Sequence, residues 1–276
     1  MKRVKGLGQT GFVTVKEADI YYEIAGKGNS IVFLHGAPLD SRMWEPQMDA
    51  LSKQFQVIRF DLRGLGKTKD PGFPFTLYED IHSLLQTLQI EKASFVGASF
   101  GSYVGVEFAL AYPEMVERLV LVCPGGFEPP SEDRQQWFKK MTEAFHHGNI
   151  EEALDINLHL LLDGPEQQKG RVQERREWLN EIFREIFSQS AAQGNKPTWL
   201  EPDPRGRLEE VWVPTLIVSG QLDHPDFIRT AERLASQISH AKHVMLHNSA
   251  HFPNIDSPNE MNELIERFCS ADILSK

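Results

Sequence analysis

Residues Val96–Gly105 read VGASFGSYVG, and the single serine between glycines follows an apolar run and precedes a helical pattern. Ser99 has two interpretations. Serine is a favoured helix N-cap, and glycine is common where a strand turns tightly into a helix. Alternatively, Gly97 and Gly101 let the strand and the helix nearly touch, which would hold a nucleophilic serine on a strained turn. The rest of the sequence is needed to distinguish a capping residue from a nucleophile.

Short apolar runs alternate with helical patterns on both sides of this turn. The runs are too continuous for a half-exposed sheet and are typical of strands buried on both faces. They end at Leu34, Phe60, Gly97, Cys123, Gly220 and Leu246. A hairpin over 12–24 comes before them, and helical patterns lie near 44–51, 76–88, 100–112, 226–238 and 258–269. The sequence therefore predicts an α/β fold, with a mostly parallel sheet of about eight strands and helices on both faces.

The alternation breaks from about Glu128 to Arg205, where the chain is helical and charged and shows no strand pattern. We expect residues 128–205 to form a helical cap over the carboxyl edge of a core domain that comprises 1–127 and 206–276. The large apolar side chains of this segment recur at helical spacing, and most of them should serve packing. A few should face the cleft, and we take these as candidates for substrate binding: Trp137, Met141, Phe145 and Trp178.

The composition is that of an ordinary globular protein, since the 276 residues are 41% hydrophobic and 25% charged. Basic side chains number 29 and acidic ones 39, which gives a formal net charge of −10. This charge disfavours nucleic acid and anionic membrane surfaces as partners. The sequence has neither a secretory segment nor an apolar run of about 18 residues, so we expect a soluble, cytoplasmic protein. The oligomeric state stays open.

Both cysteines, Cys123 and Cys269, lie in apolar settings, LVLVC and IERFC. Free cysteines buried for packing are therefore favoured over a disulfide. His243, His247 and His251 are spaced by four, but the stretch HVMLHNSAH is typical of a strand that runs into a loop. It does not resemble the metal-binding face of a helix. We expect no metal and no cofactor.

Two residues that could activate Ser99 follow later strands of the predicted sheet. Asp223 lies in GQLDHPDF after the strand TLIVSG, and His251 lies in HNSAHFPN after the next strand. The carboxyl ends of parallel strands meet at one edge, so these loops should converge on Ser99. A serine hydroxyl needs a base to take its proton, and the base needs an acid that fixes its tautomer. The order Ser, Asp, His favours a catalytic triad, with Glu128 as a second candidate for the acid.

The negative charge that develops on a substrate oxygen requires a pair of hydrogen-bond donors. The backbone N–H of Phe100, at the start of a helix, is one candidate. The loop HGAP after the strand SIVFL should supply the other, and we assign it to the backbone N–H of Ala37. His35 and Gly36 support this loop. We expect His35 to order the loop rather than to transfer protons.

Together these motifs resemble the α/β-hydrolase fold superfamily. The resemblance is carried by HGAP, DLRGLGKT, GASFG, GQLD and AHFPN, in a pattern that extends from about residue 12 to residue 270. It implies an esterase-like member with a nucleophile elbow at Ser99, a triad completed by Asp223 and His251, a helical cap and no cofactor. Pro38 after HGA is familiar in the epoxide hydrolases and haloalkane dehalogenases of the superfamily. Those enzymes use an aspartate nucleophile, so we set both activities aside.

The function expected is a serine hydrolase of small carboxylic esters or related acyl compounds such as lactones or thioesters, acting through an acyl-enzyme. Its partners would be a small-molecule acyl substrate and water. Two other activities would use the same triad: hydrolysis of a carbon–carbon bond in vinylogous diketones, and cofactor-free perhydrolysis. A protein of another class, a small-molecule sensor that binds a protein partner, could also keep the triad. The physiological substrate does not follow from the sequence.

Overall fold

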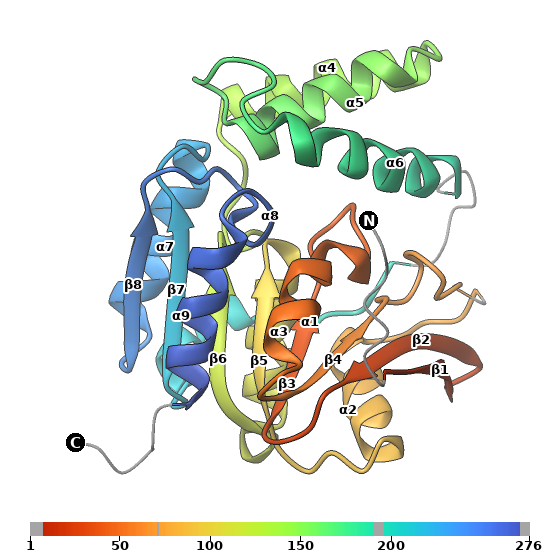
Figure 1. Ribbon diagram of the computed structural model, residues 1–276, viewed down its shortest axis with the longest axis vertical. Coiled ribbons are helices and arrows are strands. Elements are labelled where there is room, and N and C mark those ends of the chain that lie inside the picture. The colour runs from red at the N-terminus through yellow and green to blue at the C-terminus, as the bar shows by residue number, and fades with distance from the viewer. Residues whose placement is uncertain (1–7, 71, 190–195, 271–276) are drawn as a thin grey trace.

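The computed structural model describes residues 8–70, 72–189 and 196–270 (Figure 1). Residues 1–7, 71 and 271–276 of the expected core domain and 190–195 of the expected cap lie outside these ranges. The described residues form one sheet of eight strands in the order β1-β2-β4-β3-β5-β6-β7-β8, which confirms the predicted α/β fold. The strands are β1 (Gln9–Val15), β2 (Ala18–Ala25), β3 (Ser30–Leu34), β4 (Gln56–Phe60), β5 (Ala93–Ala98), β6 (Val116–Val122), β7 (Thr215–Gly220) and β8 (Ala241–Leu246).

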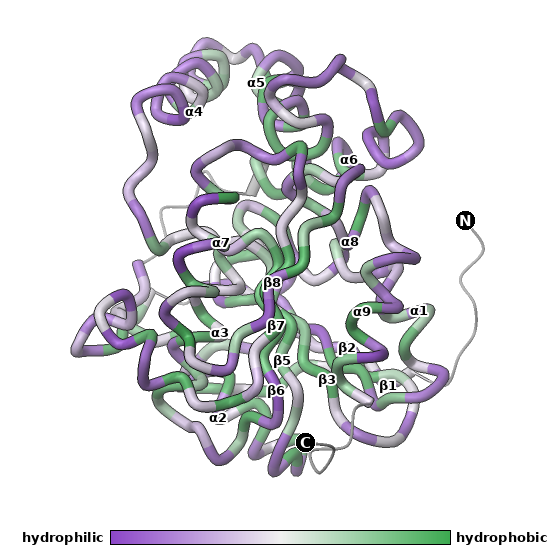
Figure 2. The backbone as a smooth tube through the Cα atoms, turned by 90° about the vertical axis from the view of Figure 1, so that its left-hand side faces the viewer, coloured by the Kyte–Doolittle hydropathy of each residue, from purple (hydrophilic) through white to green (hydrophobic). Residues whose placement is uncertain are grey.

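The sheet is mostly parallel. Strand β2 is antiparallel to β1 and β4, and every other neighbouring pair is parallel. The central strands are apolar because both of their faces are buried: β3 turns Ile31 and Phe33 to one face, and Val32 and Leu34 to the other. The hydrophobic colour in Figure 2 accordingly runs along the strands. The carboxyl ends of the parallel strands all meet at one edge of the sheet.

Helices cover both faces of the sheet, as the sequence predicts. The face of Ile31 and Phe33 carries α1 (Glu45–Leu51) and α9 (Pro258–Ser270), and the short α8 (Pro253–Asp256) contacts both of these helices. The opposite face carries α2 (Leu77–Thr87), α3 (Phe100–Ala111) and α7 (Pro225–Gln237). Short 3-10 turns join these elements: Ser41–Trp44, Pro113–Met115, Pro204–Gly206 and Leu208–Glu210.

Between β6 and β7 the chain forms a helical layer that lies beyond the carboxyl ends of the strands (Figure 1). The described residues of this segment contain helices and no strand, as predicted. Apolar side chains of the layer, among them Leu158, Leu179 and Phe183, belong to the same buried cluster as β3 and α9. The layer therefore packs on the core. Its helices are α4 (Glu132–His146), α5 (Ile150–Leu158), a π-helical turn (His159–Asp163) and α6 (Gln173–Gln189).

Local features of the fold also follow the sequence. The predicted hairpin is confirmed, and β1 pairs with β2 along its whole length. Cys123 and Cys269 are both buried and free. In the described parts of the chain, no helix is both long and apolar enough to cross a membrane.

Candidate active site

Ser99 lies on the turn between β5 and α3, at the carboxyl edge of the sheet. Its backbone has a φ of 50° and a ψ of −113°, a conformation that is strained for a residue with a Cβ atom. The turn is tight because the flanking glycines leave room for it. A Cβ on Gly97 would lie 2.3 Å from the carbonyl oxygen of Gly101, and a Cβ on Gly101 would lie 2.2 Å from that of Leu34. The predicted strained turn is therefore present.

The Ser99 side chain does not cap α3. Ser99 occupies the N-cap position, but its hydroxyl makes no capping hydrogen bond. Instead Oγ points over Gly125 in the loop after β6, where an added Cβ would lie 2.9 Å from it. The backbone fixes this loop, since Gly125 N donates to the Ser99 carbonyl at 3.1 Å. Among the described residues Oγ has no hydrogen-bond partner, so capping does not explain the serine.

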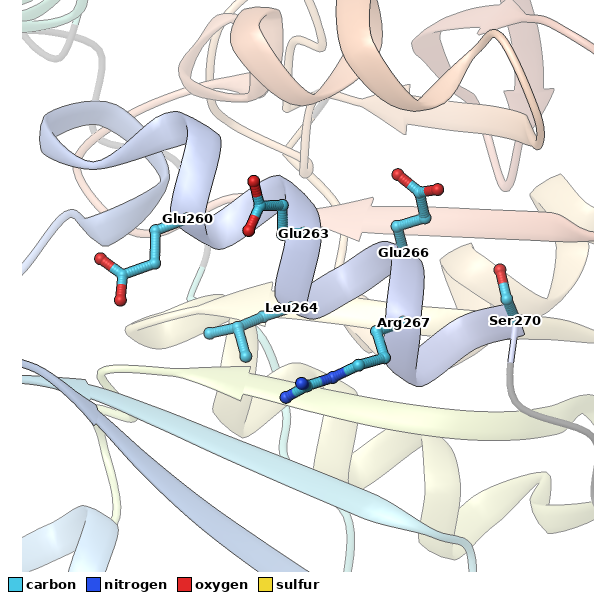
Figure 3. Close-up of a pocket in the computed structure, with 6 residues that line it drawn as sticks. All are labelled: Glu260, Glu263, Leu264, Glu266, Arg267 and Ser270. Carbon is cyan, nitrogen blue, oxygen red and sulfur yellow. The ribbon is translucent and has the colours of Figure 1, made fainter. Parts of the chain in front are cut away.

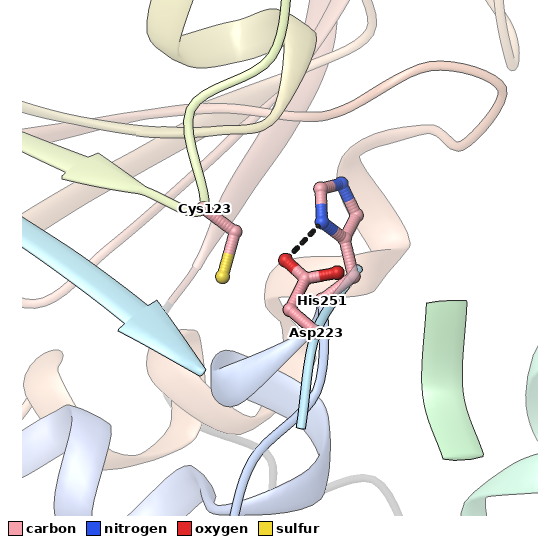
Figure 4. Close-up of side chains that lie close together, drawn as sticks. All are labelled: Cys123, Asp223 and His251. Carbon is pink, nitrogen blue, oxygen red and sulfur yellow. Dashed lines mark hydrogen bonds and ion pairs between the residues drawn. The ribbon is translucent and has the colours of Figure 1, made fainter. Parts of the chain in front are cut away.

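Asp223 and His251 meet at the same edge of the sheet. Nδ1 of His251 donates to Oδ2 of Asp223 at 2.7 Å (Figure 4). The second oxygen, Oδ1, accepts from the His224 backbone N–H at 2.7 Å. The side chains of His251 and Asp223 are only 2% and 1% exposed. Because the carboxylate fixes the proton on Nδ1, Nε2 is left as an acceptor that points away from Asp223. Glu128 lies elsewhere and pairs with Arg233 at 2.6 Å.

Phe227 packs on the ring of His251, and the guanidinium of Arg134 packs on the ring of Phe227 to form a stack of three side chains. The ring centroids of Phe227 and His251 are 3.9 Å apart, and Cζ of Arg134 lies 4.5 Å from the Phe227 centroid. Phe227 belongs to α7 and Arg134 to α4, so the stack connects the histidine with the helical layer. Nε of Arg134 also lies 3.5 Å from Oδ2 of Asp226. Sequence reasoning missed this stack because it depends on a tertiary contact between α4 and α7 that no local motif signals.

The loop after β3 passes beside Ser99. A Cβ on Gly36 would lie 3.3 Å from the Cβ of Ser99, so the loop backbone touches the turn. His35 is fully buried, and its Nε2 accepts from the Leu62 N–H at 2.9 Å. Its Nδ1 lies 3.1 Å from the Gly36 carbonyl oxygen. Burial lowers the pKa of His35, which keeps the ring neutral. Both ring nitrogens are thus used to hold backbone groups.

The two backbone amides assigned as oxyanion donors are those of Ala37 and Phe100. Ala37 follows Gly36 in the loop beside Ser99, and Phe100 is the first residue of α3. Neither amide donates to an acceptor within the described ranges of the chain. The first amides of a helix have no partner inside the helix, so an external acceptor is able to use them. Both N–H groups are therefore available to an oxygen atom bound beside Ser99.

The helical layer holds the loop that carries His251. The His251 backbone N–H donates to the carbonyl of Leu161, in the π-helical turn, at 3.0 Å. Arg171 donates to the Asn248 carbonyl and to the Asp256 carboxylate, both at 2.8 Å. The position of His251 is therefore fixed from two sides, by β8 in the core and by residues 159–171 of the layer.

Cys123 forms a cluster with Asp223 and His251 in which the possible ligand atoms lie within 4.8 Å of one another (Figure 4). A tetrahedral metal with bonds of about 2.0–2.3 Å would separate its ligands by roughly 3.3 Å or more. Asp223 and His251 are closer, at 2.7 Å, because a proton joins them. Burial raises the pKa of the Cys123 thiol well above its usual value, which disfavours the thiolate that a metal needs. The cluster fits a hydrogen-bonded acid–base pair better than a metal centre.

The substrate-binding candidates of the helical layer are spread over two helices. Trp137 and Met141 on α4 are half-buried, and Trp178 on α6 is half-buried against the cluster shared with the core. Phe145 is 36% exposed, and its ring lies 5.5 Å from that of Phe187. None of these four side chains lines the hollows beside Phe100, the residue that follows Ser99. Sequence periodicity identifies the apolar side of a helix, but it does not show whether that side meets the core or a ligand.

Two hollows open beside Phe100, the residue after Ser99. The first has a volume of about 280 Å³ and lies between α3, the loop after β6 and the chain that returns from the helical layer. The second, of about 230 Å³, shares only Phe100 with the first and is mainly apolar, with Leu62, Leu65, Phe75 and Leu77 in its wall. A third hollow, of about 490 Å³, is lined by α9 alone and involves none of the site residues (Figure 3).

Comparison with known proteins identifies the family of the chain. The family model described as alpha/beta hydrolase fold matches residues 29–258. The match extends from β3 across the turn of Ser99 to the loops of Asp223 and His251. The chain therefore belongs to the α/β-hydrolase fold family. It is an enzyme of the hydrolase class, as its relatives are.

Similar proteins cover almost the whole chain. A pimeloyl-[acyl-carrier protein] methyl ester esterase of Aeromonas hydrophila is 26% identical over 254 residues, 88% of this chain and 96% of the relative. A putative carbamate hydrolase of Azorhizobium caulinodans is 28% identical over 273 residues, 92% of this chain and 96% of the relative. The crystal structure of the enol-lactonase of Burkholderia xenovorans is 26% identical, with a TM-score of 0.75 over 94% of this chain and 100% of that one.

Proposed function

We propose that the protein is a serine hydrolase of small carboxylic esters or related acyl compounds such as lactones and thioesters. Ser99 is the nucleophile, His251 the general base and Asp223 the residue that orients His251. The observation that carries the proposal is the buried 2.7 Å hydrogen bond from His251 to Asp223, at the sheet edge where Ser99 occupies its strained turn. Nucleophilic acyl transfer requires a serine of this kind beside an oriented histidine.

In this mechanism, Nε2 of His251 takes the proton of Ser99 as Oγ attacks the substrate carbonyl carbon. The Asp223 carboxylate keeps Nδ1 protonated and stabilises the imidazolium that forms. The N–H groups of Ala37 and Phe100 donate to the carbonyl oxygen as it becomes an oxyanion, and each such donor contributes about 3–4 kcal/mol. His251 then protonates the leaving group. A water molecule activated by His251 finally releases the acid and restores Ser99.

The reaction also requires the hydroxyl of Ser99 to turn toward His251. The hydroxyl points over Gly125 and has no hydrogen-bond partner within the described ranges, so no bond holds it there. Serine side chains exchange between staggered χ1 positions, and catalytic hydrogen bonds often tighten only when substrate is bound. We therefore expect the bond between Ser99 and His251 to form in the substrate complex.

The helical layer is proposed to be the cap domain, residues 128–205, over a core of 1–127 and 206–276. Support comes from its contacts with the site: Arg134 packs on Phe227, and Leu161 accepts the His251 N–H. The side chains proposed to line the apolar part of a substrate pocket are those of Trp137, Met141, Phe145 and Trp178. The names of the relatives, an esterase, a carbamate hydrolase and an enol-lactonase, support a substrate with an acyl group bonded to a heteroatom.

A panel of p-nitrophenyl esters of graded acyl length tests the proposal. Wild type should turn over repeatedly, and Ser99→Ala should lose roughly a thousandfold to a millionfold in kcat. A fluorophosphonate should label wild type and leave Ser99→Ala unlabelled. Ser236→Ala, which changes an exposed serine of α7, is the matched control and should keep full activity. Full activity in Ser99→Ala would overturn the assignment.

The same experiment separates the other functions that the triad allows. Cleavage of a vinylogous diketone without ester hydrolysis would favour the carbon–carbon bond hydrolase. Peroxide-dependent formation of a peracid would favour perhydrolysis. A single slow acylation, with ligand-dependent binding of another protein, would favour the sensor.

A further inference from the structure

The first hollow beside Phe100 has the composition of a site for an organic cation. Its volume is about 280 Å³, and its wall combines aromatic rings with charged side chains: Phe100, Tyr103, Trp199, Glu201, Asp203 and Arg205. Leu200 and Gly126 also line the hollow, and Gly126 lies beside the side chain of Tyr103. The residues before Phe100 and Gly126, which are Ser99 and Gly125, meet at the Ser99 hydroxyl. Two residues of the wall, Phe100 and Gly126, therefore follow directly in the chain the two residues that meet at the hydroxyl of the proposed nucleophile.

Trp199 stands at right angles to the other two rings of the hollow. Its ring makes an angle of 80° with Phe100 at a centroid distance of 5.9 Å, and 89° with Tyr103 at 5.5 Å. Trp199 therefore packs edge to face with both rings, and the three rings together give the hollow an aromatic wall, the kind of surface that attracts ammonium groups. Trp199 is also 40% exposed, so packing against the core does not account for its whole surface.

The charged groups in the wall leave the hollow with a net negative charge. The carboxylate of Asp203 accepts from Nε of Arg205 at 2.9 Å and also from its Nη2, so these two charges offset each other. Glu201 is exposed and makes no hydrogen bond or ion pair within the described part of the chain. One carboxylate therefore remains available to a ligand, beside aromatic faces that are themselves electron-rich.

A carboxyl group that is buried behind the wall of the hollow, that of Glu107, also contributes negative charge. Oε1 of Glu107 on α3 accepts from the Leu200 N–H at 2.8 Å, while Oε2 is buried without a partner. Burial raises the pKa of Glu107 to about 7, so this carboxyl is partly ionised at neutral pH. Burial and the nearby carboxylates of Glu107 and Asp203 raise the pKa of Tyr103 to about 12, although Arg205 opposes them. Among the charged groups that act on Tyr103, the carboxylates outnumber the single guanidinium of Arg205.

We propose that this hollow binds an ammonium group of about the size of choline, held by the aromatic faces around Trp199 and by the carboxylate of Glu201. A small inorganic cation fits less well, since it requires several oxygen ligands where this wall offers rings. Phe100, which lines the hollow, directly follows Ser99 in the chain, so the proposal rests on the proposed function and narrows it. Esters whose acyl or alcohol part carries an ammonium group are the favoured substrates.

Ligand-observed NMR tests the binding without any catalysis. Choline and its uncharged isostere 3,3-dimethylbutan-1-ol are titrated with the full-length protein at constant ionic strength. Choline should bind about tenfold more tightly, which corresponds to ~1.4 kcal/mol. Glu201→Gln should weaken choline severalfold and leave the isostere unchanged, and Trp199→Leu should weaken both ligands. Trp212→Leu and Glu209→Gln change exposed residues outside the hollow and should bind choline as wild type does.

Equal affinities for choline and the isostere would overturn the cation site. The same conclusion follows if neither Glu201→Gln nor Trp199→Leu changes choline binding. Glu201 is exposed, so its variant should fold, and a circular dichroism melt checks this for both variants.

Kinetics form a second arm, which separates the cation site from the proposed function. The kcat/KM ratio of butyrylcholine to 3,3-dimethylbutyl butyrate should fall severalfold in Glu201→Gln and keep its wild-type value in Glu209→Gln, which changes an exposed carboxylate outside the hollow. An unchanged ratio would overturn the narrowed substrate class. If choline binds as expected but Ser99→Ala hydrolyses p-nitrophenyl butyrate as fast as wild type, the proposed function fails and the cation site stands.

Discussion

With glycine in place of Ser99 the protein should be more stable than with alanine there, although both substitutions remove activity. With a φ of 50° and a ψ of −113°, Ser99 is strained, and for a residue with a Cβ such strain costs about 1–3 kcal/mol. Glycine avoids this cost but loses more backbone freedom on folding, by about 0.5–1 kcal/mol relative to alanine. Ser99→Gly should therefore be more stable than Ser99→Ala by up to about 2.5 kcal/mol. In a chain of this size that difference raises Tm by up to about 4 °C.

Urea denaturation and calorimetry of the two variants measure this difference. Ser99→Ala is the reference because it lacks the hydroxyl and keeps the Cβ. The same pair of substitutions at Ser83, in the interior of helix α2, should show the opposite order, since glycine disfavours a helix interior by up to ~1 kcal/mol relative to alanine. Both Ser99 variants should fail to hydrolyse p-nitrophenyl butyrate. If Ser99→Gly is the less stable of the two, the turn stores no strain and the reasoning from its dihedral angles is refuted.

Three further predictions concern residues around this turn. The pKa of Glu107 is about 7 in the fold, against 4.5 for a free side chain. The protonated side chain therefore contributes its full stability below about pH 4.5, and this contribution is lost as the pH rises to about 7. Urea titrations of Glu107→Gln should show that the variant gains stability relative to wild type between pH 5 and pH 8, by at most ~3 kcal/mol. Gly97→Ala would place a Cβ 2.3 Å from the carbonyl oxygen of Gly101 and should destabilise the fold by ~3 kcal/mol or more, whereas Gly206→Ala, which has open space around it, should melt like wild type. Asp223→Asn should keep the wild-type melting curve and lower kcat by about 10⁴, because an amide does not hold the histidine in the required tautomer; a rate within about tenfold of wild type would contradict the role of Asp223.

The sheet and the position of the candidate site could be predicted because both depend on local patterns. A strand buried on both faces reads as a continuous apolar run, as Ile31 to Leu34 do, and a strand order of this type brings the loops after β5, β7 and β8 to one edge. Gly97 and Gly101 mark the close approach of strand and helix from their spacing alone. The contact between Asp223 and His251 then follows from topology.

Contacts between distant elements could not be predicted in this way. The packing of Arg134 on Phe227 joins α4 to α7, and the hydrogen bond of Glu107 joins α3 to the chain that returns from the helical layer. Glu107 did leave a signal, since it is the one acidic residue in the apolar stretch YVGVEFALA. A buried acid in such a stretch indicates a partner, but the sequence does not say which backbone group it will hold.

Because Leu161 and Arg171 hold the loop of His251, the helical layer is not an exchangeable module. A chimaera that grafts a foreign segment over 128–205 would lose the carbonyl that receives the His251 N–H and the guanidinium that binds Asn248 and Asp256. Protein engineers who seek a new specificity should therefore retain Arg134 and residues 159–171 when they replace the rest of α4 or α6. During evolution, the same constraint would let the sequences of the outer helices diverge. The sequence of the π-helical turn would change only when the loop after β8, which it holds, changes as well.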